Sequence, residues 1–194
     1  MIGNNVIIYQ NNHIDGDSII GDNVTIYPNS FISNSIIGKG TKIYSSYIEN
    51  AEVGNCCFIG PYAHLRTGAK IENFVKIGNF CEIKNANIGD NSKVSHLAYV
   101  GDASIGKNCN IGCGVIFVNY NGKVKQKTIV GDGVFVGSNV NLIAPVEIEN
   151  GAYICAGTTV DKNVSKNDFV IGRVRQETKK GLATKYFCKK IDWQ

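Results

Sequence analysis

Aliphatic residues recur at every sixth position along most of the chain, and this spacing predicts the fold. The first run is Ile2, Ile8, Ile14, Ile20, Ile26 and Ile32, and the spacing then continues with a few steps of five. A period of six matches neither the helical period of about 3.6 nor the alternation of a half-buried strand. Hexapeptide repetition is typical of a parallel β-helix, in which each hexapeptide supplies one short strand and one turn. Three hexapeptides make a coil of about 18 residues, so about nine stacked coils are predicted.

Residues 118–129 interrupt this spacing with a polar and basic segment, after which the aliphatic positions resume. Loops that break a rigid scaffold often carry function, so we expect a protruding loop with functional residues beside it. The spacing ends near residue 160, which predicts a β-helix domain at 1–160 and a basic C-terminal arm at 161–194. Within the arm, Leu182 and Tyr186 are four positions apart, as in a short helix.

The composition favours the same all-β fold. The chain has 44 Ile and Val residues but only 4 Leu, and β-branched side chains favour extended backbone because their χ1 angle is restricted. The 23 Asn and 22 Gly residues tolerate the positive φ angles of tight turns. The predicted fold class is therefore an all-β parallel β-helix.

The seven cysteines lie scattered through the repeat without CxxC spacing. We interpret them as small buried apolar residues rather than as a disulfide framework, which indicates a reducing compartment. The sequence shows no charged leader followed by an apolar run, and no stretch of about 18 apolar residues. These features predict a cytoplasmic protein with no membrane partner.

Positive charge is concentrated at the C-terminal end. Residues 1–160 contain 11 Lys and Arg against 12 Asp and Glu, whereas residues 161–194 contain 9 against 4. The body lacks the interleaved aromatic and basic residues that would extend a nucleic-acid footprint. A phosphorylated small molecule or a neighbouring subunit is therefore favoured as the partner of the arm, and nucleic acid is not expected.

One column of residues lies two positions after the aliphatic residues of one face. It contains Asn79, His96, Cys113, Ser138 and Ala156, and Arg173 continues it if Ile171 marks the next coil. Four coil steps make the column from His96 to Arg173 about 19 Å long, close to the length of an extended pantetheine arm. His96 falls at a coil corner near the interruption, so we interpret it as functional, with an ordinary surface histidine as the alternative.

A second column carries two cations. Arg66 and Lys84 follow the aliphatic residues of the next face on adjacent coils, with Gly101 above them. Two unpaired cations about 5 Å apart repel by roughly 1 kcal/mol in water, and an anion between them would reverse the sign. From the spacing alone, two side chains that splay into solvent are the favoured interpretation, and an anion site is the alternative.

A zinc site built from three histidines is not predicted. His13 and His64 fall three coils apart, or about 14 Å, whereas zinc ligands lie about 2 Å from the metal. We therefore expect no metal in this protein.

Several segments are more specific than the repeat itself. They are residues 59–66 (IGPYAHLR), 77–84 (IGNFCEIK), 95–103 (SHLAYVGDA), 119–122 (NYNG), 134–138 (VFVGS), 156–159 (AGTT) and 173–174 (RV). With these segments the chain resembles, over nearly its whole length, the acetyltransferase half of a bacterial bifunctional family. That family combines glucosamine-1-phosphate N-acetyltransferase with N-acetylglucosamine-1-phosphate uridyltransferase. The resemblance implies a left-handed β-helix, acetyl-CoA as cosubstrate, no metal for acetyl transfer, and a homotrimer with active sites between subunits.

The same resemblance implies a role for each candidate residue. His96 is the expected general base. Arg66, Lys84, Tyr99 and Asn110 hold the sugar phosphate, Cys113, Asn119, Tyr120, Ser138, Ala156 and Arg173 line the acetyl-CoA site, and Glu82 and Asn119 complete the catalytic set.

The implied reaction is attack of the sugar amine on the thioester, which gives N-acetylglucosamine-1-phosphate for UDP-N-acetylglucosamine and peptidoglycan precursor synthesis. An amine with a pKa near 8 is mostly protonated at neutral pH, so a base is useful. Glu82, one coil below Tyr99, is expected to orient the imidazole of His96. The backbone N–H of Cys113, stacked over His96, is the expected oxyanion donor.

Three departures separate the chain from that family. The nucleotidyltransferase domain has no counterpart in the 194 residues, so uridylyl transfer is not expected here and a separate uridyltransferase is left open. Cys113 stands where the family usually has Ala, and Thr67 follows Arg66 where the family has Pro. Two other functions therefore stay open: an acyltransferase for another, nucleotide-linked amino sugar, and a non-catalytic hexapeptide scaffold.

Overall fold

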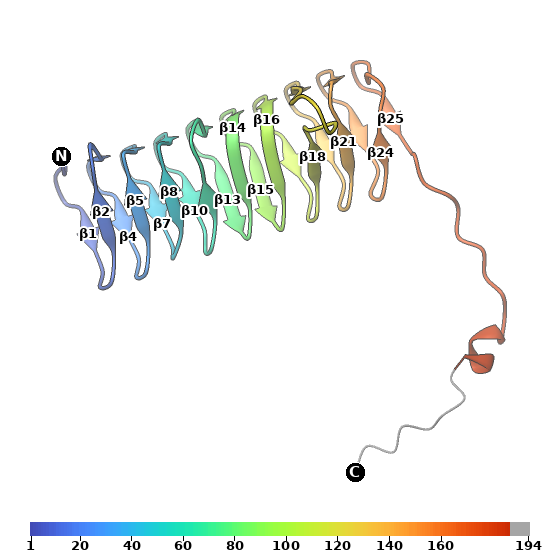
Figure 1. Cartoon of the computed structure of the whole chain (residues 1–194), viewed down its shortest axis with the longest axis horizontal. Coiled ribbons are helices and arrows are strands. Elements are labelled where there is room, and N and C mark those ends of the chain that lie inside the picture. The colour runs from blue at the N-terminus through green and yellow to red at the C-terminus, as the bar shows by residue number, and fades with distance from the viewer. Residues whose placement is uncertain (187–194) are drawn as a thin grey trace, which may run out of the picture.

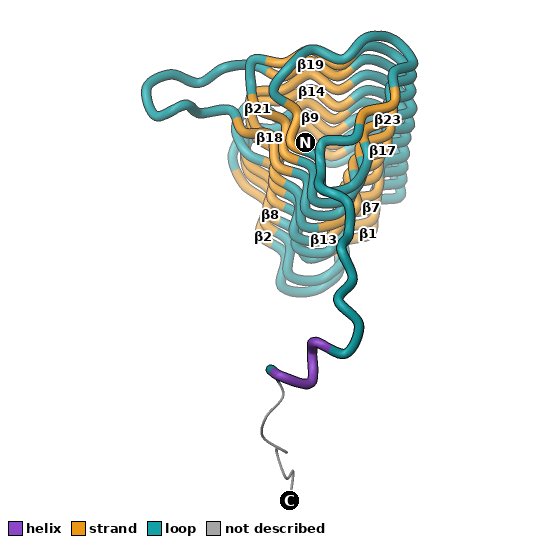
Figure 2. Tube along the Cα trace, turned by 90° about the vertical axis from the view of Figure 1, so that its right-hand side faces the viewer, coloured by secondary structure: helices purple, strands orange, loops and turns teal. Residues whose placement is uncertain are grey.

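The computed structural model describes residues 1–186; residues 187–194, the end of the predicted arm, lie outside the described residues. The body is a parallel β-helix whose coils stack in one direction from the N-terminus to the C-terminus (Figure 1). Seen along the stack, the coils have a triangular outline (Figure 2). The predicted all-β fold is confirmed, and the left-handed sense of the coils stays a prediction.

The first face of the triangle is a ten-stranded parallel sheet. Its strands are β1 (Ile7–Ile8), β4 (Thr25–Ile26), β7 (Lys42–Ile43), β10 (Phe58–Ile59), β13 (Lys76–Asn79), β15 (Lys93–His96), β17 (Asn110–Ile111), β20 (Phe135–Val136), β23 (Tyr153–Ile154) and β25 (Phe169–Val170). Ten strands mean ten coils, one more than the spacing predicted. The last strand pairs Val170 with Ile154, so the β-helix continues past the predicted boundary at residue 160.

The second and third faces share one sheet because β14 (Glu82–Ile88) and β16 (Tyr99–Ile105) continue around the corner between them. The second face also contains β2 (His13–Asp15), β5 (Phe31–Ser33), β8 (Tyr47–Glu49), β11 (His64–Leu65), β18 (Ile116–Val118), β21 (Asn141–Ile143) and β24 (Thr159–Val160). The third face also contains β3 (Ile19–Ile20), β6 (Ile36–Ile37), β9 (Glu52–Val53), β12 (Lys70–Ile71), β19 (Thr128–Val130) and β22 (Val146–Ile148).

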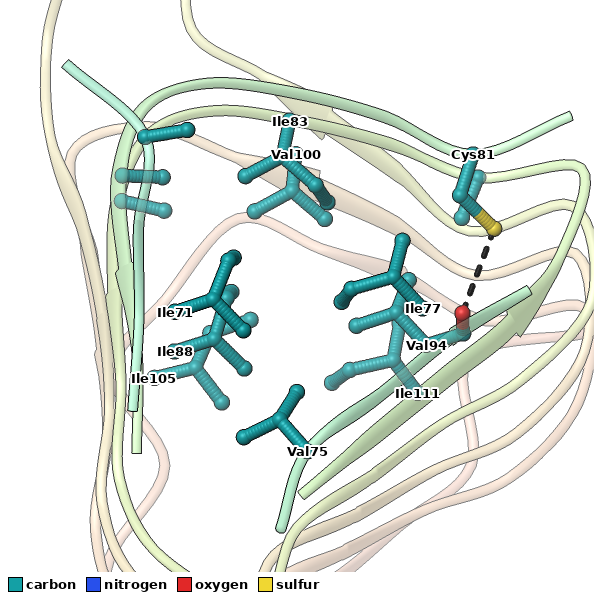
Figure 3. Packing of buried hydrophobic residues seen from close by; sticks show 14 of the residues in the cluster. Ile71, Val75, Ile77, Cys81, Ile83, Ile88, Val94, Val100, Ile105 and Ile111 are labelled. Carbon is teal, nitrogen blue, oxygen red and sulfur yellow. Dashed lines mark hydrogen bonds between the residues drawn. The ribbon is translucent and has the colours of Figure 1, made fainter. Parts of the chain in front are cut away.

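The aliphatic residues that carry the spacing point inward and form the core. Ile77, Val94 and Ile111 stack on the first face, and Ile88 and Ile105 stack on the third (Figure 3). All five are at most 1% exposed. Burial of one such side chain contributes about 1.5–3 kcal/mol, which is why the spacing of six specifies the fold so strongly.

Most cysteines in the described part of the chain serve this core. Cys57, Cys81, Cys109 and Cys155 are buried, as predicted. The Cys81 thiol donates to the carbonyl oxygen of Val94 at 3.3 Å (Figure 3), and burial raises its pKa. The prediction of burial is wrong for Cys56, which is exposed, and for Cys113, which is partly exposed.

Two segments leave the body. The predicted loop is present as residues 119–127 between β18 and β19, and it protrudes from one corner of the triangle (Figure 2). After β25 the chain runs away from the coils as an arm with one short 3-10 helix, η1 (Leu182–Lys185), where a short helix was expected (Figure 1). Across residues 1–186 no helix has the length and apolar character of a membrane span, and no three metal-ligating side chains gather.

Candidate active site

His96 is the last residue of β15, at the corner between the first and second faces, and its side chain is exposed. The register places Asn79 beside it on the preceding coil, with His96 Nδ1 at 2.6 Å from Asn79 Oδ1. An amide oxygen only accepts hydrogen bonds, so Nδ1 carries the proton in this contact. The basic atom of the neutral ring is then Nε2, and Asn79 fixes the tautomer that a base acting through Nε2 needs.

Glu82 does not orient His96, contrary to the expectation from the sequence. Its Oε1 accepts a hydrogen bond from Arg66 Nη1 at 2.6 Å, because β11 and β14 place the two residues on adjacent coils of the second face. This hydrogen bond raises the pKa of Arg66. Asn79 therefore takes the orienting position that Glu82 was expected to hold.

The predicted stacking of one column of residues is present over four coils. The strands pair Val94 with Ile111, Ile111 with Val136, and Val136 with Ile154, so the residues two positions later stack in the same order. These residues are His96, Cys113, Ser138 and Ala156. His96, Ser138 and Ala156 are exposed, so the column forms an open edge along the body.

Arg173 does not continue this column by register. Val170, and not Ile171, pairs with Ile154, so Gly172 is the residue that follows Ala156. The Arg173 side chain nevertheless returns to the column, since its Nη1 donates to the carbonyl oxygen of Ala156 at 2.8 Å. The prediction that Arg173 follows Ala156 in register is therefore wrong, although its guanidinium contacts the backbone of Ala156.

The backbone around Cys113 leaves one N–H group available. The neighbouring Gly112 N–H donates to the carbonyl oxygen of Val136 at 2.8 Å, and the Gly114 N–H donates to the backbone carbonyl oxygen of His96 at 3.4 Å. Within residues 1–186 the N–H of Cys113 donates to no acceptor. An unpaired backbone donor one coil from His96 is a group that could stabilise an oxyanion.

The second face holds the polar residues predicted to bind a sugar phosphate. Arg66 and Lys84 are neighbours on adjacent coils, and Tyr99 lies on the next coil in register with Glu82; all three are partly exposed. The expectation that both cations lack a partner is wrong for Arg66, which pairs with Glu82. Both partners of that ion pair are about two-fifths exposed (40% and 37%), so the pair contributes little to stability.

Lys84 instead lies beside a second lysine, Lys125 of the loop. The Lys84 ammonium lies close enough to Lys125 to lower the pKa of Lys125, an effect that Asp102 and Tyr99 oppose. The predicted pair of Arg66 and Lys84 as unpaired cations is therefore wrong, and the lysine beside Lys84 is Lys125. Two adjacent cations repel each other, and an anion between them would relieve that repulsion.

The loop that supplies Lys125 is an ordered hairpin. Tyr120 and Lys125 form an antiparallel bridge, and the Gln126 N–H donates to the Asn119 carbonyl at 2.8 Å. The Asn119 side chain is buried and donates from Nδ2 to Asp102 Oδ2 at 2.5 Å. Tyr120 is exposed, and its hydroxyl donates to the Gly122 carbonyl at 2.8 Å.

Asn110 is separate from the other residues predicted to bind the sugar. It begins β17 on the first face, where its neighbours in adjacent coils are Lys93 and Phe135. Tyr99 and Lys84 project from the second face, on the other side of the corner that carries His96. Within one chain, Asn110 therefore cannot complete the site formed by the second face.

The sequence-based reasoning missed three residues that shape this site. They are Asn79, Asp102 and Lys125. Asn79 was placed in the correct column without a role, and Asp102 is the only acidic residue in the segment 95–103. The usable signal for Lys125 was the alternation of Lys123, Lys125 and Lys127 inside the interruption.

Comparison with solved structures shows the fold. The structure of LpxA, a UDP-N-acetylglucosamine acyltransferase from Bacteroides fragilis, matches with a TM-score of 0.54 at 18% identity, over 87% of this chain and 70% of that chain. The Arabidopsis UDP-N-acetylglucosamine acyltransferase matches with a TM-score of 0.52 at 15% identity, over 89% of this chain and 71% of that chain.

Comparison with curated sequences gives nearer relatives. The chain is 51% identical over 185 residues to the bifunctional protein GlmU of Clostridioides difficile (strain 630), and 46% identical over 184 residues to that of Shouchella clausii (strain KSM-K16). Each match covers 95% of this chain but 40% of the relative, so the chain spans about two-fifths of the length of these proteins. The model of the bacterial transferase hexapeptide family (six repeats) matches residues 1–34, 50–85 and 127–162, more than half of the chain, and the chain belongs to that family.

Proposed function

We propose that this chain is an N-acetyltransferase that transfers the acetyl group of acetyl-CoA to the amine of glucosamine-1-phosphate. The observation that carries the proposal is the placement of His96, with its tautomer fixed by Asn79, one coil from the cation pair of Lys84 and Lys125. A base and an anion receptor on adjacent coils suit a substrate that carries both an amine and a phosphate.

In the proposed reaction, His96 Nε2 removes a proton from the sugar amine, and the amine nitrogen attacks the thioester carbonyl carbon. The carbonyl oxygen becomes an oxyanion in the tetrahedral intermediate, and the free N–H of Cys113 is placed one coil away to donate to it. Collapse of the intermediate breaks the carbon–sulfur bond. The imidazolium then supplies a proton to the departing thiolate of coenzyme A, which restores the neutral base.

Acetyl-CoA is proposed to lie along the column from His96 to Ala156, with its thioester beside Cys113. The column is an open edge of stacked coils, and Arg173 lies over its far end. Arg173 and the other cations of the arm are suited to the phosphates of the coenzyme. Asn119, Tyr120 and Ser138 are proposed to border the same site. This reaction uses no metal, and it should therefore persist in a chelator.

The sugar site is proposed to be completed by a second copy of the chain in a homotrimer. Asn110 lies on the first face, away from Tyr99 and Lys84 on the second, so a neighbouring copy has to supply it. Mixed trimers test this arrangement. His96→Ala and Asn110→Ala chains should each be weakly active alone, and a mixture assembled together should recover activity. No recovery from mixed trimers would refute a shared site.

An assay of coenzyme A release with a panel of acceptors tests the function. Glucosamine-1-phosphate, glucosamine and a UDP-linked amino sugar are supplied with acetyl-CoA, and His96→Ala is the blank. Selective turnover of glucosamine-1-phosphate supports the proposal, and selective turnover of the UDP-linked sugar supports the other acyltransferase. The absence of turnover with every acceptor would leave a non-catalytic scaffold as the function.

A further inference from the structure

Asp102 occupies the middle of a column of corner residues that leads to the loop. Gly68, Asn85, Asp102 and Asn119 follow one another at intervals of 17 residues, the length of one coil in this part of the chain. The first three turn the corner between the second and third faces with positive φ angles of 79°, 45° and 49°. At Asn119 the chain leaves the coil instead and enters the hairpin.

The two carboxylate oxygens of Asp102 accept one hydrogen bond from each neighbour in this column. Oδ1 accepts from Asn85 Nδ2 at 2.6 Å, and Oδ2 accepts from Asn119 Nδ2 at 2.5 Å. Burial opposes ionisation, but these two bonds and the nearby Lys84 and Lys125 together lower the pKa of Asp102. The carboxylate is therefore charged at neutral pH, and it ties the base of the loop to the coil beneath.

The rest of the loop stands away from the body. A cavity of about 420 Å³ lies between its return limb and the coils, with Lys70, Asn87, Lys125 and Lys127 around it. The side-chain hydrogen bonds that connect the loop to the coils come from Asn119, to Asp102 and, at 3.4 Å, to the Tyr99 hydroxyl. Loss of the acceptor for Asn119 would therefore weaken the attachment of the loop to the coils.

Asp102 also carries the negative charge that faces the cation pair. Lys84 and Lys125 lower its pKa, and Asp102 in turn opposes the effect of Lys84 on Lys125. Without this carboxylate the two ammonium groups would repel with less compensation, and Lys125 would be free to move outward with the loop. The hydrogen bond from Asn119 and the negative charge of Asp102 therefore both hold the loop against the coils.

We propose that Asp102 is the positioning residue that seats the loop at 119–127 on the coils and holds Lys125 beside Lys84. The phosphate site is then assembled before the acceptor binds, so no loop ordering has to accompany binding. The effect on acceptor binding rests on the proposed function of the site. The seating of the loop is independent of that function and can be measured separately.

Two substitutions separate the contributions of Asp102. Asp102→Gly removes both acceptors and keeps the positive φ, as Gly68 does at the same corner. Asp102→Asn also tolerates positive φ and keeps one acceptor oxygen, but it removes the charge. A control is Asp90→Gly at another corner, since Asp90 Oδ1 accepts from the Asn73 N–H at 3.0 Å and from Asn73 Nδ2 at 3.2 Å, and Oδ2 pairs with Lys107, all without contact to the loop.

Trypsin cleavage after Lys123, Lys125 and Lys127, followed by mass spectrometry on the full chain, reports how often the loop opens. We expect Asp102→Gly to raise the cleavage rate by about tenfold or more, which corresponds to the loss of one charge-assisted hydrogen bond. The cleavage rate of Asp102→Asn should lie between those of Asp102→Gly and the unmodified protein. Asp90→Gly should leave loop cleavage unchanged. Thermal unfolding of each variant identifies cleavage that follows from global unfolding.

Steady-state kinetics provide the second measurement. The KM for glucosamine-1-phosphate should rise about tenfold in Asp102→Gly, more than the KM for acetyl-CoA, and Asp102→Asn should restore part of the loss. Equal loop cleavage in Asp102→Gly and the unmodified protein would overturn the proposal. Faster cleavage without a selective rise in the acceptor KM would overturn the link to the phosphate site. Faster cleavage in a protein that acetylates no acceptor would support the seating role and refute the proposed function.

Discussion

Replacing Lys125 with Gln tests whether the cation pair holds the phosphate of the acceptor. Gln is similar in length and removes the charge, so Lys84 remains as a single cation at the site. A charge-assisted hydrogen bond to phosphate corresponds to about tenfold to a hundredfold in affinity. We expect the KM for glucosamine-1-phosphate to rise by that factor. The kcat at saturation should change less, because the proposed base and the proposed coenzyme column are untouched.

The comparison of two acceptors isolates the phosphate from other effects. The unmodified enzyme should prefer glucosamine-1-phosphate over free glucosamine by about a hundredfold in kcat/KM. Lys125→Gln should remove most of that preference by penalising the phosphorylated sugar alone. Arg66→Ala should remove less of the preference, because Glu82, at 2.6 Å, already compensates the charge of Arg66.

Lys123→Gln is the matched control for this prediction. Lys123 lies in the same loop, and its backbone N–H donates to Asn121 Oδ1 at 3.0 Å whatever its side chain is. This variant should keep the acceptor preference of the unmodified protein. Loss of activity to the same extent with both acceptors in Lys125→Gln would refute the reasoning, since it would mean that the loop contributes through its structure and not through the charge of Lys125.

Further outcomes follow from the core, the base, the arm and the corner carboxylate. His96→Ala should lower kcat by about two to four orders of magnitude with little change in acetyl-CoA affinity by calorimetry, and more than a tenth of the activity remaining would exclude it as the base. Truncation after Val170 should raise the KM for acetyl-CoA, whereas truncation after Tyr186, which keeps Arg173, should raise it less. Ile77→Ala, at a fully buried position, should lower the free energy of unfolding by about 2–5 kcal/mol in denaturant titrations. The pKa of Asp102 lies below its ordinary value of 3.8, so the carboxylate should hold the loop fully above pH 3.8. Hydrogen-exchange protection of the loop should be lost only as the pH falls through the lowered pKa. Asp102→Asn should lack this acid transition.

The sequence predicted the fold well because one physical requirement repeats along it. Each coil has to bury an aliphatic residue from every face, as Ile77, Val94 and Ile111 do on the first face, so the coil length is three times the burial period of six. A register error of one residue would expose such a side chain, which makes the alignment of coils highly specific. The columns that contain His96 and Lys84 follow from that alignment.

The contacts within those columns could not be predicted in the same way. Register places Glu82 near both Arg66 and Tyr99, and Asn79 beside His96, but it does not determine which side chain turns toward which neighbour. Those choices depend on side-chain rotamers and on local charge. The side chain of Glu82 turns toward a permanent cation, which attracts a carboxylate more strongly than a neutral imidazole does.

Loop residues are less predictable still, because a segment outside the coils has no register to inherit. Lys125 reaches Lys84 only because the hairpin folds back at Tyr120 and because Asn119 is fixed to Asp102. Gly101 is part of the same arrangement, since a Cβ at that position would clash with the Tyr99 hydroxyl and would lie 2.8 Å from Asn119 Nδ2. The glycine directly above the predicted cation column thus leaves the space that the base of the loop occupies, and the site on the second face depends on a residue with no side chain as much as on its charged ones.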